Sequence, residues 1–122
     1  MNTCTFIGRF TNDPELKSVK TADGDINTNV VNFRLAITRK FKKGNGELGK
    51  QTNFLDFEAW DSGAEVIVKN FRKGDPIIIH ASARSDVYEF TNQDNETKRI
   101  NTVRFRVEKF EFVPSKIDHE EE

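Results

Sequence analysis

The sequence predicts an all-β domain, a five-stranded antiparallel barrel with one short helix between its third and fourth strands. Apolar and polar residues alternate in five separate segments, which is the period of a half-buried strand. Only residues 62–74 place apolar side chains at helical spacing and end in a glycine. The 122 residues are enough for one domain with one modest core.

The first three strands are expected at residues 2–10, 30–38 and 52–60. Asp13-Pro14 follows the first strand and ends it, because proline fixes φ and lacks a backbone donor. Turns are expected at residues 22–25 and 43–46, which are rich in glycine and polar residues. The alternation assigns these residues to the core side of the three strands: Cys4, Phe6, Gly8, Phe10, Val31, Phe33, Leu35, Ile37, Asn53, Leu55, Phe57 and Ala59.

The helix is expected to begin at Ser62, with Glu65 reaching back to form a capping box, and to end before Gly74. The fourth and fifth strands follow at residues 77–90 and 100–113, joined by a polar hairpin tip at 91–96. The apolar residues of the fifth strand change from odd to even positions, which predicts a β-bulge near Glu108-Lys109. Three strands, a helix and two strands is the order of an oligonucleotide/oligosaccharide-binding (OB) barrel.

Four aromatic residues fall on polar strand faces or strand ends, where a core does not need them: Phe41, Phe54, Trp60 and Tyr88. Phe41 lies inside the run Arg39-Lys40-Phe41-Lys42-Lys43, and Arg84 precedes Tyr88 by four residues. Flat rings beside cations are suited to an unpaired nucleic-acid strand, because bases stack on the rings and phosphates bind the charges. The alternative is that these rings pack in the core or between subunits, and Phe90 is open to all three roles.

The net charge of −1 is unusual for a nucleic-acid-binding protein. Residues 1–113 hold 18 cationic and 16 acidic residues, a net charge of +2, whereas residues 114–122 hold one lysine and four acids. Affinity for phosphate must therefore come from local patches. The sequence does not decide whether three further arginines contact phosphate or are surface charges: Arg99, Arg104 and Arg106. The candidates for phosphate and backbone contact are Arg9, Arg34, Arg39, Lys40, Lys42, Lys43 and Arg84.

No catalytic or cofactor site is expected. Asp56 and Glu58 share a strand face without a histidine or nucleophile beside them, so an enzyme is not predicted. Cys4 is the only cysteine and the chain has two histidines, which excludes a disulfide within the chain and argues against a metal site. No apolar stretch could span a membrane and no secretory signal is visible, so we expect a cytoplasmic protein.

The sequence also resembles the bacterial and phage single-stranded DNA-binding proteins. Residues 2–16 read Asn-x-x-x-Phe-Ile-Gly-Arg-Phe-x-x-Asp-Pro-Glu-Leu, close to the opening of that family. The match continues in order through residues 31–36, 39–41, 51–54, 71–75 and 83–88. It covers residues 1–113, the expected DNA-binding domain, and leaves 114–122 as a short acidic flexible tail.

The resemblance implies that Phe41, Phe54, Trp60 and Tyr88 are the base-stacking residues. It implies a homo-oligomer, tetramer or dimer, that binds and protects single-stranded DNA without strong sequence preference in replication, recombination and repair. It also implies a bacterial or phage-infected host cytoplasm, and an acidic tip that recruits replication and repair proteins. This chain departs from the family in having almost no linker and no terminal phenylalanine. The alternative functions are a protein-interaction or primosome-type factor and a barrel that binds RNA.

Overall fold

The computed structural model describes residues 1–20 and 27–114. The turn expected at residues 22–25 and the acidic residues from 115 onward lie outside the described residues. No helix in the described ranges is long and apolar enough to cross a membrane. The elements in chain order are β1 (Cys4–Phe10), β2 (Leu16–Lys20), β3 (Asn27–Lys42), β4 (Leu48–Trp60), α1 (Asp61–Asn70), β5 (Pro76–Thr91) and β6 (Thr97–Phe112).

Five of these strands close into a barrel in the order β1-β5-β6-β4-β3, with β3 pairing back to β1 at Arg9↔Ala36. The predicted five-stranded barrel with one helix after its third strand is therefore confirmed. Two details differ. The short strand β2 is added at the edge of β3, and all five of its residues are exposed, so it has no burial pattern for the sequence to reveal. The β4–β6 pairing is parallel, because closing the barrel joins two strands that are not neighbours in the chain.

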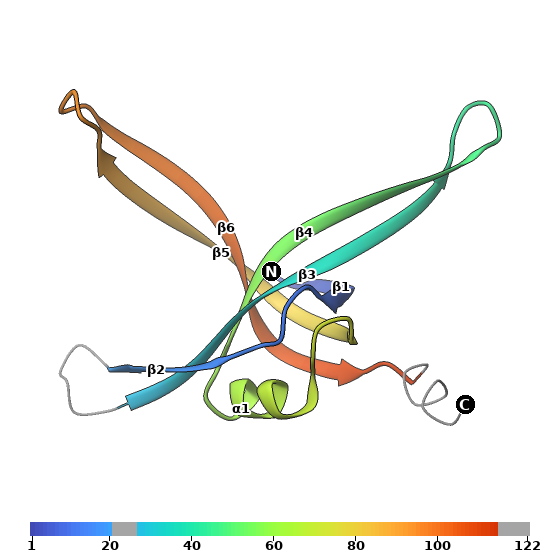
Figure 1. Ribbon diagram of the computed structural model, residues 1–122, viewed down its shortest axis with the longest axis horizontal. Coiled ribbons are helices and arrows are strands. Elements are labelled where there is room, and N and C mark those ends of the chain that lie inside the picture. Colours follow the sequence, from blue (N-terminus) through green and yellow to red (C-terminus); the bar gives the residue numbers. More distant parts are fainter. Residues whose placement is uncertain (21–26, 115–122) are drawn as a thin grey trace.

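Two long ribbons project from the barrel and diverge from one another, on the side opposite α1 (Figure 1). We call them the β3–β4 arm and the β5–β6 arm. In the first, pairing continues out to Lys42↔Leu48, and in the second out to Thr91↔Thr97. Strands β3, β5 and β6 each have 16 residues, so they run well beyond the barrel, and the outer half of each arm has no buried core residue.

The core lies where the predicted inward-facing rows meet. Phe57 is fully buried, and its ring centre lies 5.4 Å from that of Phe6, 5.6 Å from Phe33 and 5.4 Å from Phe105. Burying a side chain of this size contributes about 1.5–3 kcal/mol. The predicted orientations of the first three barrel strands are confirmed for the residues inside the barrel. Helix α1 closes one end through the buried side chains of Ala64 and Ile67.

The predicted capping box does not form. The chain passes from β4 into α1 without a connecting residue, so the helix begins at Asp61, which takes a positive φ of 54°. No side chain caps its first turn, and the carboxylate of Glu65 accepts a hydrogen bond from Asn29 Nδ2 at 2.9 Å. Gly74 follows the helix in a turn with φ of 90°, and its N–H donates to the carbonyl of Phe10 at 2.8 Å.

The predicted bulge in the last strand is confirmed. Ala81 pairs with Val107 and His80 with Lys109, so Glu108 has no partner in the ladder. The Glu108 carboxylate accepts a hydrogen bond from the Ser82 hydroxyl at 2.9 Å. The extra residue moves the inward-facing row of β6 by one position, and Phe110 therefore packs against the core.

Candidate nucleic-acid interface

The strand register separates the four predicted aromatic residues onto two faces. Even-numbered residues of β4, including Phe54 and Trp60, point away from the core, and β6 continues this surface because Glu58 pairs with Arg106. Tyr88 alternates with the buried Ile77 and Ile79 of β5 and therefore belongs to the same surface, which we call the outer face. Phe41 continues the inward-facing row of β3 and lies on the opposite side of its arm.

Phe41 lies flat across the neighbouring strand of its arm. Its cross-strand partner is Gly49, and a Cβ atom placed on Gly49 would come within 2.6 Å of the Phe41 ring. A glycine is therefore required for the ring to rest on the backbone of β4. One side of the ring is covered in this way, and 37% of Phe41 stays exposed. The arm thus holds the ring in a fixed orientation near its tip.

Phe54 and Tyr88 are the most accessible of the four rings, with exposed fractions of 59% and 50%. Phe54 stands opposite Ala36, whose small side chain leaves the ring open. Tyr88 stands opposite Ile100, and Phe90 follows on the same face of the β5–β6 arm. Ile100 and Phe90 are each almost half exposed, so this arm presents a continuous apolar strip around Tyr88. Exposed apolar patches of this kind mark interaction surfaces.

Trp60 lies on the predicted face but is half-buried in a polar cluster. Its indole Nε1 donates to the Glu58 carboxylate at 2.7 Å. The guanidinium carbon of Arg106 lies over the ring, 5.7 Å from its centre, and Arg106 Nη2 is 3.7 Å from Glu58 Oε2. Trp60 is therefore fixed at the point where β4 meets β6, and an arginine already occupies a position above its ring.

Arg34 and Asp56 form an exposed ion pair on the outer face. Arg34 Nε donates to Asp56 Oδ1 at 2.8 Å and Nη2 donates to Oδ2 at 3.3 Å. The hydrogen bond from Arg34 lowers the pKa of Asp56, and the nearby charge of Arg104 lowers that pKa further. The same contact raises the pKa of Arg34. The carboxylate is thus held ionised between two arginines.

The remaining predicted cations lie in three places. Arg39, Lys40, Lys42 and Lys43 are all exposed at the tip of the β3–β4 arm. Arg84 is exposed at the base of the β5–β6 arm. Arg9 lies on β1, where its Nη1 donates to the carbonyl of Gly74 at 2.9 Å, away from both arm tips.

Two further cations join the predicted ones through cross-strand pairing. Lys50 stands opposite Lys40, and Arg104 stands opposite Arg84. Like charges placed directly opposite each other destabilise a sheet, so each pair favours an anion between its members. Sequence reasoning missed Lys50 and left Arg104 undecided. Both could have been found from the hairpin pairing. Counting outward from the centre of each hairpin tip places Lys50 opposite Lys40 and Arg104 opposite Arg84.

The structure separates the three arginines that the sequence left undecided. Arg99 forms an ion pair with Glu89 at 3.0 Å, and Arg106 belongs to the Trp60 cluster. Arg104 stands opposite Arg84, and its charge acts on Asp56 of the neighbouring arm. The Nε2 atom of His80 lies 2.9 Å from the carboxylate of Glu111 on the neighbouring strand β6. Among the described residues, no group of three or more potential metal ligands comes together.

The topology and this surface define an OB barrel with two exposed arms that carry aromatic and cationic side chains. A family model described as the single-strand binding protein family matches residues 1–113. The chain therefore belongs to the single-strand binding protein family.

Related proteins agree with this assignment. The chain is 29% identical to single-stranded DNA-binding protein 3 of Listeria innocua over 116 residues, covering 95% of this chain and 66% of that protein. It is 33% identical to the single-stranded DNA-binding protein of Clostridium perfringens over 115 residues, covering 94% and 67% of the two chains. The chain thus spans about two thirds of the length of these relatives.

Solved structures share the fold. A Plasmodium falciparum SSB in complex with ssDNA superposes with a TM-score of 0.65 at 25% identity, covering 91% of each chain. A deletion mutant of the single-stranded DNA-binding protein from Thermus aquaticus superposes with a TM-score of 0.72 at 17% identity. That match covers 95% of this chain and 52% of the Thermus chain, and it supports the fold alone.

The contact between Phe41 and Gly49 generates a prediction. Gly49→Ala places a methyl group where the ring lies, so the ring has to leave the strand. We expect the upfield ring-current shift of the residue-49 Hα proton to disappear in proton NMR spectra. Gly44→Ala is the matched control, because a Cβ there meets nothing within 4 Å. An unchanged Hα shift in the Gly49→Ala variant would contradict the described orientation.

Proposed function

We propose that this chain binds and protects single-stranded DNA, without strong sequence preference, during replication, recombination and repair. The observation that carries the proposal is an OB barrel of the single-strand binding family whose arms expose aromatic rings beside unpaired cations. We assign the DNA-binding domain to residues 1–113 and a short acidic tail to residues 114–122. Binding is the proposed activity, with no catalytic step, and we place it in the cytoplasm of a bacterium or of a phage-infected host.

We propose that the strand crosses the outer face between the arms. Bases stack on Phe54 and Tyr88, and Phe41 offers a further ring at the tip of the β3–β4 arm. Stacking tolerates any sequence, because every base has a flat face. Trp60 joins this path only if a base displaces the Arg106 guanidinium or shares the ring with it, so we expect Trp60 to contribute less than the two open rings.

We propose that phosphates bind the cations that have no acidic partner in the described chain. Lys40, Lys42, Lys43, Lys50 and Arg39 form such a group at the tip of the β3–β4 arm. Arg84 and Arg104 form a second group, because the bidentate hydrogen bonds of Asp56 go to Arg34. A phosphate that binds Arg34 has to compete with Asp56. Arg9 would contact only a strand that passes along β1.

We also propose that the chain assembles into a homo-oligomer, either a dimer or a tetramer. Ile7 of β1 is 61% exposed and stands opposite Ile78 of β5, outside the two arms. An apolar side chain on a barrel wall is suited to contact with a second copy. Replication and repair proteins remain the proposed partners of the acidic tail.

Removing the open rings should weaken binding. Stacking contributes about 1–3 kcal/mol per base, so Phe54→Ala and Tyr88→Ala should each raise the Kd for polythymidine about tenfold. Val87→Ala is the matched control, because Val87 is 53% exposed on the opposite face of the same arm. Fluorescence anisotropy with labelled polythymidine, duplex DNA and RNA measures all three variants.

The same titrations decide between the alternatives. Tight binding to RNA alone, or no binding to any nucleic acid, would overturn the proposed function in favour of an RNA-binding or protein-interaction role. If Val87→Ala weakened binding as much as Tyr88→Ala, the assignment of the outer face would be wrong.

The lysines at the arm tip should set the salt dependence. Each phosphate contact with a single strand contributes about −0.7 to the slope of log affinity against log salt. Replacing Lys40, Lys42 and Lys43 together by glutamine should reduce this slope by up to about 2. Replacing Lys69 and Lys109, which lie near the helix end of the barrel, should leave it unchanged. A slope that survives the triple replacement would show that these lysines do not contact phosphate.

A further inference from the structure

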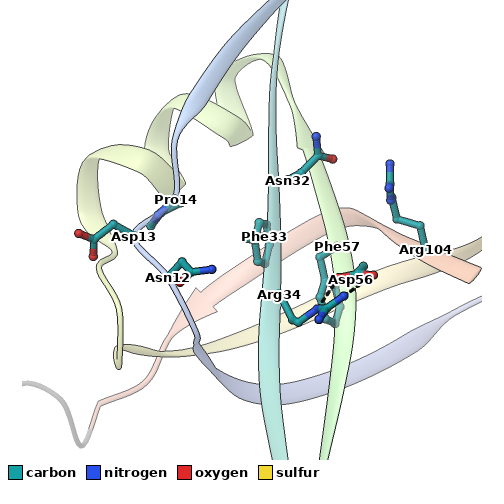
Figure 2. A pocket seen from close by; sticks show the side chains of 9 residues that line it. All are labelled: Asn12, Asp13, Pro14, Asn32, Phe33, Arg34, Asp56, Phe57 and Arg104. Carbon is teal, nitrogen blue, oxygen red and sulfur yellow. Dashed lines mark hydrogen bonds and ion pairs between the residues drawn. The ribbon is translucent and has the colours of Figure 1, made fainter.

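A cavity of about 280 Å³ opens on the outer face (Figure 2). It lies between the segment that joins β1 to β2 and the strands β3, β4 and β6. Phe33 and Phe57 contribute to its wall from the core side. Its polar lining comes from four different parts of the chain: Asn12, Asp13, Asn32, Arg34, Asp56 and Arg104.

The cavity continues into a second hollow of about 410 Å³. The two share Asn12, Asp13 and Asn32, and the second extends to Glu15 and Lys17. Together they form one trough, which we call the Asn12–Asn32 trough. The arginines and Asp56 line one end, the two amides and Asp13 line the part that both hollows share, and Lys17 and Glu15 line the other end.

The wall of the trough is fixed by hydrogen bonds. The Thr11 N–H and hydroxyl both donate to the carbonyl of Arg34, at 3.1 and 2.9 Å. Asp13 Oδ1 accepts from the Lys73 N–H at 2.7 Å, which ties the segment to the turn after α1. The trough is therefore formed before any ligand arrives, which reduces the entropic cost of binding.

The amides in the middle of the trough are available for recognition. Asn12 and Asn32 are exposed, and within the described part of the chain their side chains make no hydrogen bond. An amide group offers both donors and an acceptor, so it can bind the polar edge of a base. The carboxylates of Asp13 and Asp56 lie beside these amides. An ionised carboxylate can accept hydrogen bonds but cannot donate them.

This chemistry distinguishes between bases. A carboxylate accepts a hydrogen bond from the exocyclic amino group of cytosine. Thymine has a carbonyl oxygen at the same position, which a carboxylate repels. Pockets for drug-sized ligands range from about 300 to 1,000 Å³. The cavity of about 280 Å³ lies just below this range and therefore suits a smaller group such as a single base.

We propose that the Asn12–Asn32 trough holds one nucleotide of the bound strand and favours a base with an exocyclic amino group, such as cytosine, over thymine. The exocyclic amino group donates to Oδ2 of Asp13, since the Lys73 N–H occupies Oδ1. Asn12 and Asn32 bind the rest of the base edge, and the flanking phosphates meet Arg104 and Lys17. The inference rests on the proposed function, to which it adds one position that reads the base within an otherwise sequence-tolerant interface.

The test compares cytosine and thymine homopolymers of equal length, because their rings are of the same size. The quantity measured is the ratio of the two Kd values. Asp13→Asn keeps the side-chain size, replaces one carboxylate oxygen by an NH2 donor and leaves an oxygen to accept from the Lys73 N–H. It should reduce the preference for cytosine, relative to the unaltered chain, by about fivefold, which corresponds to one hydrogen bond. Asp94→Asn is the matched control, since Asp94 is exposed at the tip of the β5–β6 arm and does not line the trough.

The outcomes separate this inference from the proposed function. If the chain binds both homopolymers and Asp13→Asn does not change the ratio, the trough does not read a base. Equal losses on both homopolymers would overturn the base preference. Failure of the unaltered chain to bind either homopolymer would overturn the proposed function itself.

A second measurement does not depend on the folding of any variant. The side-chain amide signals of Asn12 and Asn32 can be followed in ¹H–¹⁵N NMR spectra of the unaltered chain. We expect them to shift on addition of deoxycytidine monophosphate and to shift less with thymidine monophosphate. Equal shifts with both nucleotides, or none with either, would contradict the proposal.

Discussion

The continuous pairing of β3 with β4 is the constraint on which the rest of the site depends. The ladder runs unbroken from Val30↔Trp60 inside the barrel to Lys42↔Leu48 at the arm tip. Side chains alternate strictly along a strand, so the contact between Phe33 and Phe57 in the core also determines the orientation of every residue in the arm. A slip of one residue would bury Asp56 and move Phe54 to the other face. The core thus positions a surface that extends beyond it.

Charge is distributed along the arms in a way that reconciles the net charge of −1 with binding to phosphate. Close to the barrel, acids hold arginines in place: Asp56 binds Arg34, and Glu58 binds both Arg106 and Trp60. At the tip of the β3–β4 arm, the lysines have no such partners among the described residues. Exposed ion pairs contribute only about 0–1 kcal/mol, so Arg34 can be released to a phosphate at little cost, whereas the carboxylate that holds Arg106 is buried. The acids near the barrel thus orient arginine side chains, and the lysines at the arm tip attract phosphate.

The sequence predicted the parts of the structure that depend on alternation and on turn position. The inward rows of the barrel strands, the polar hairpin tip and the bulge at Glu108 all follow from local patterns. It failed where the outcome depends on contacts between distant residues. The capping box did not form because Glu65 binds Asn29, and Trp60 is less open than expected because Arg106 lies over it. Strand β2 was not predicted because it has no buried face.

We propose that the two arms and the outer face between them form the DNA-binding surface. The most direct test is to follow backbone amide signals by ¹H–¹⁵N NMR during titration with short polythymidine. The largest changes are expected in residues 39–43 and 50–54 of the first arm and 84–90 of the second. Almost none are expected in α1, at the opposite end of the barrel. Changes concentrated in α1, with both arms unaffected, would contradict this assignment of the DNA-binding surface.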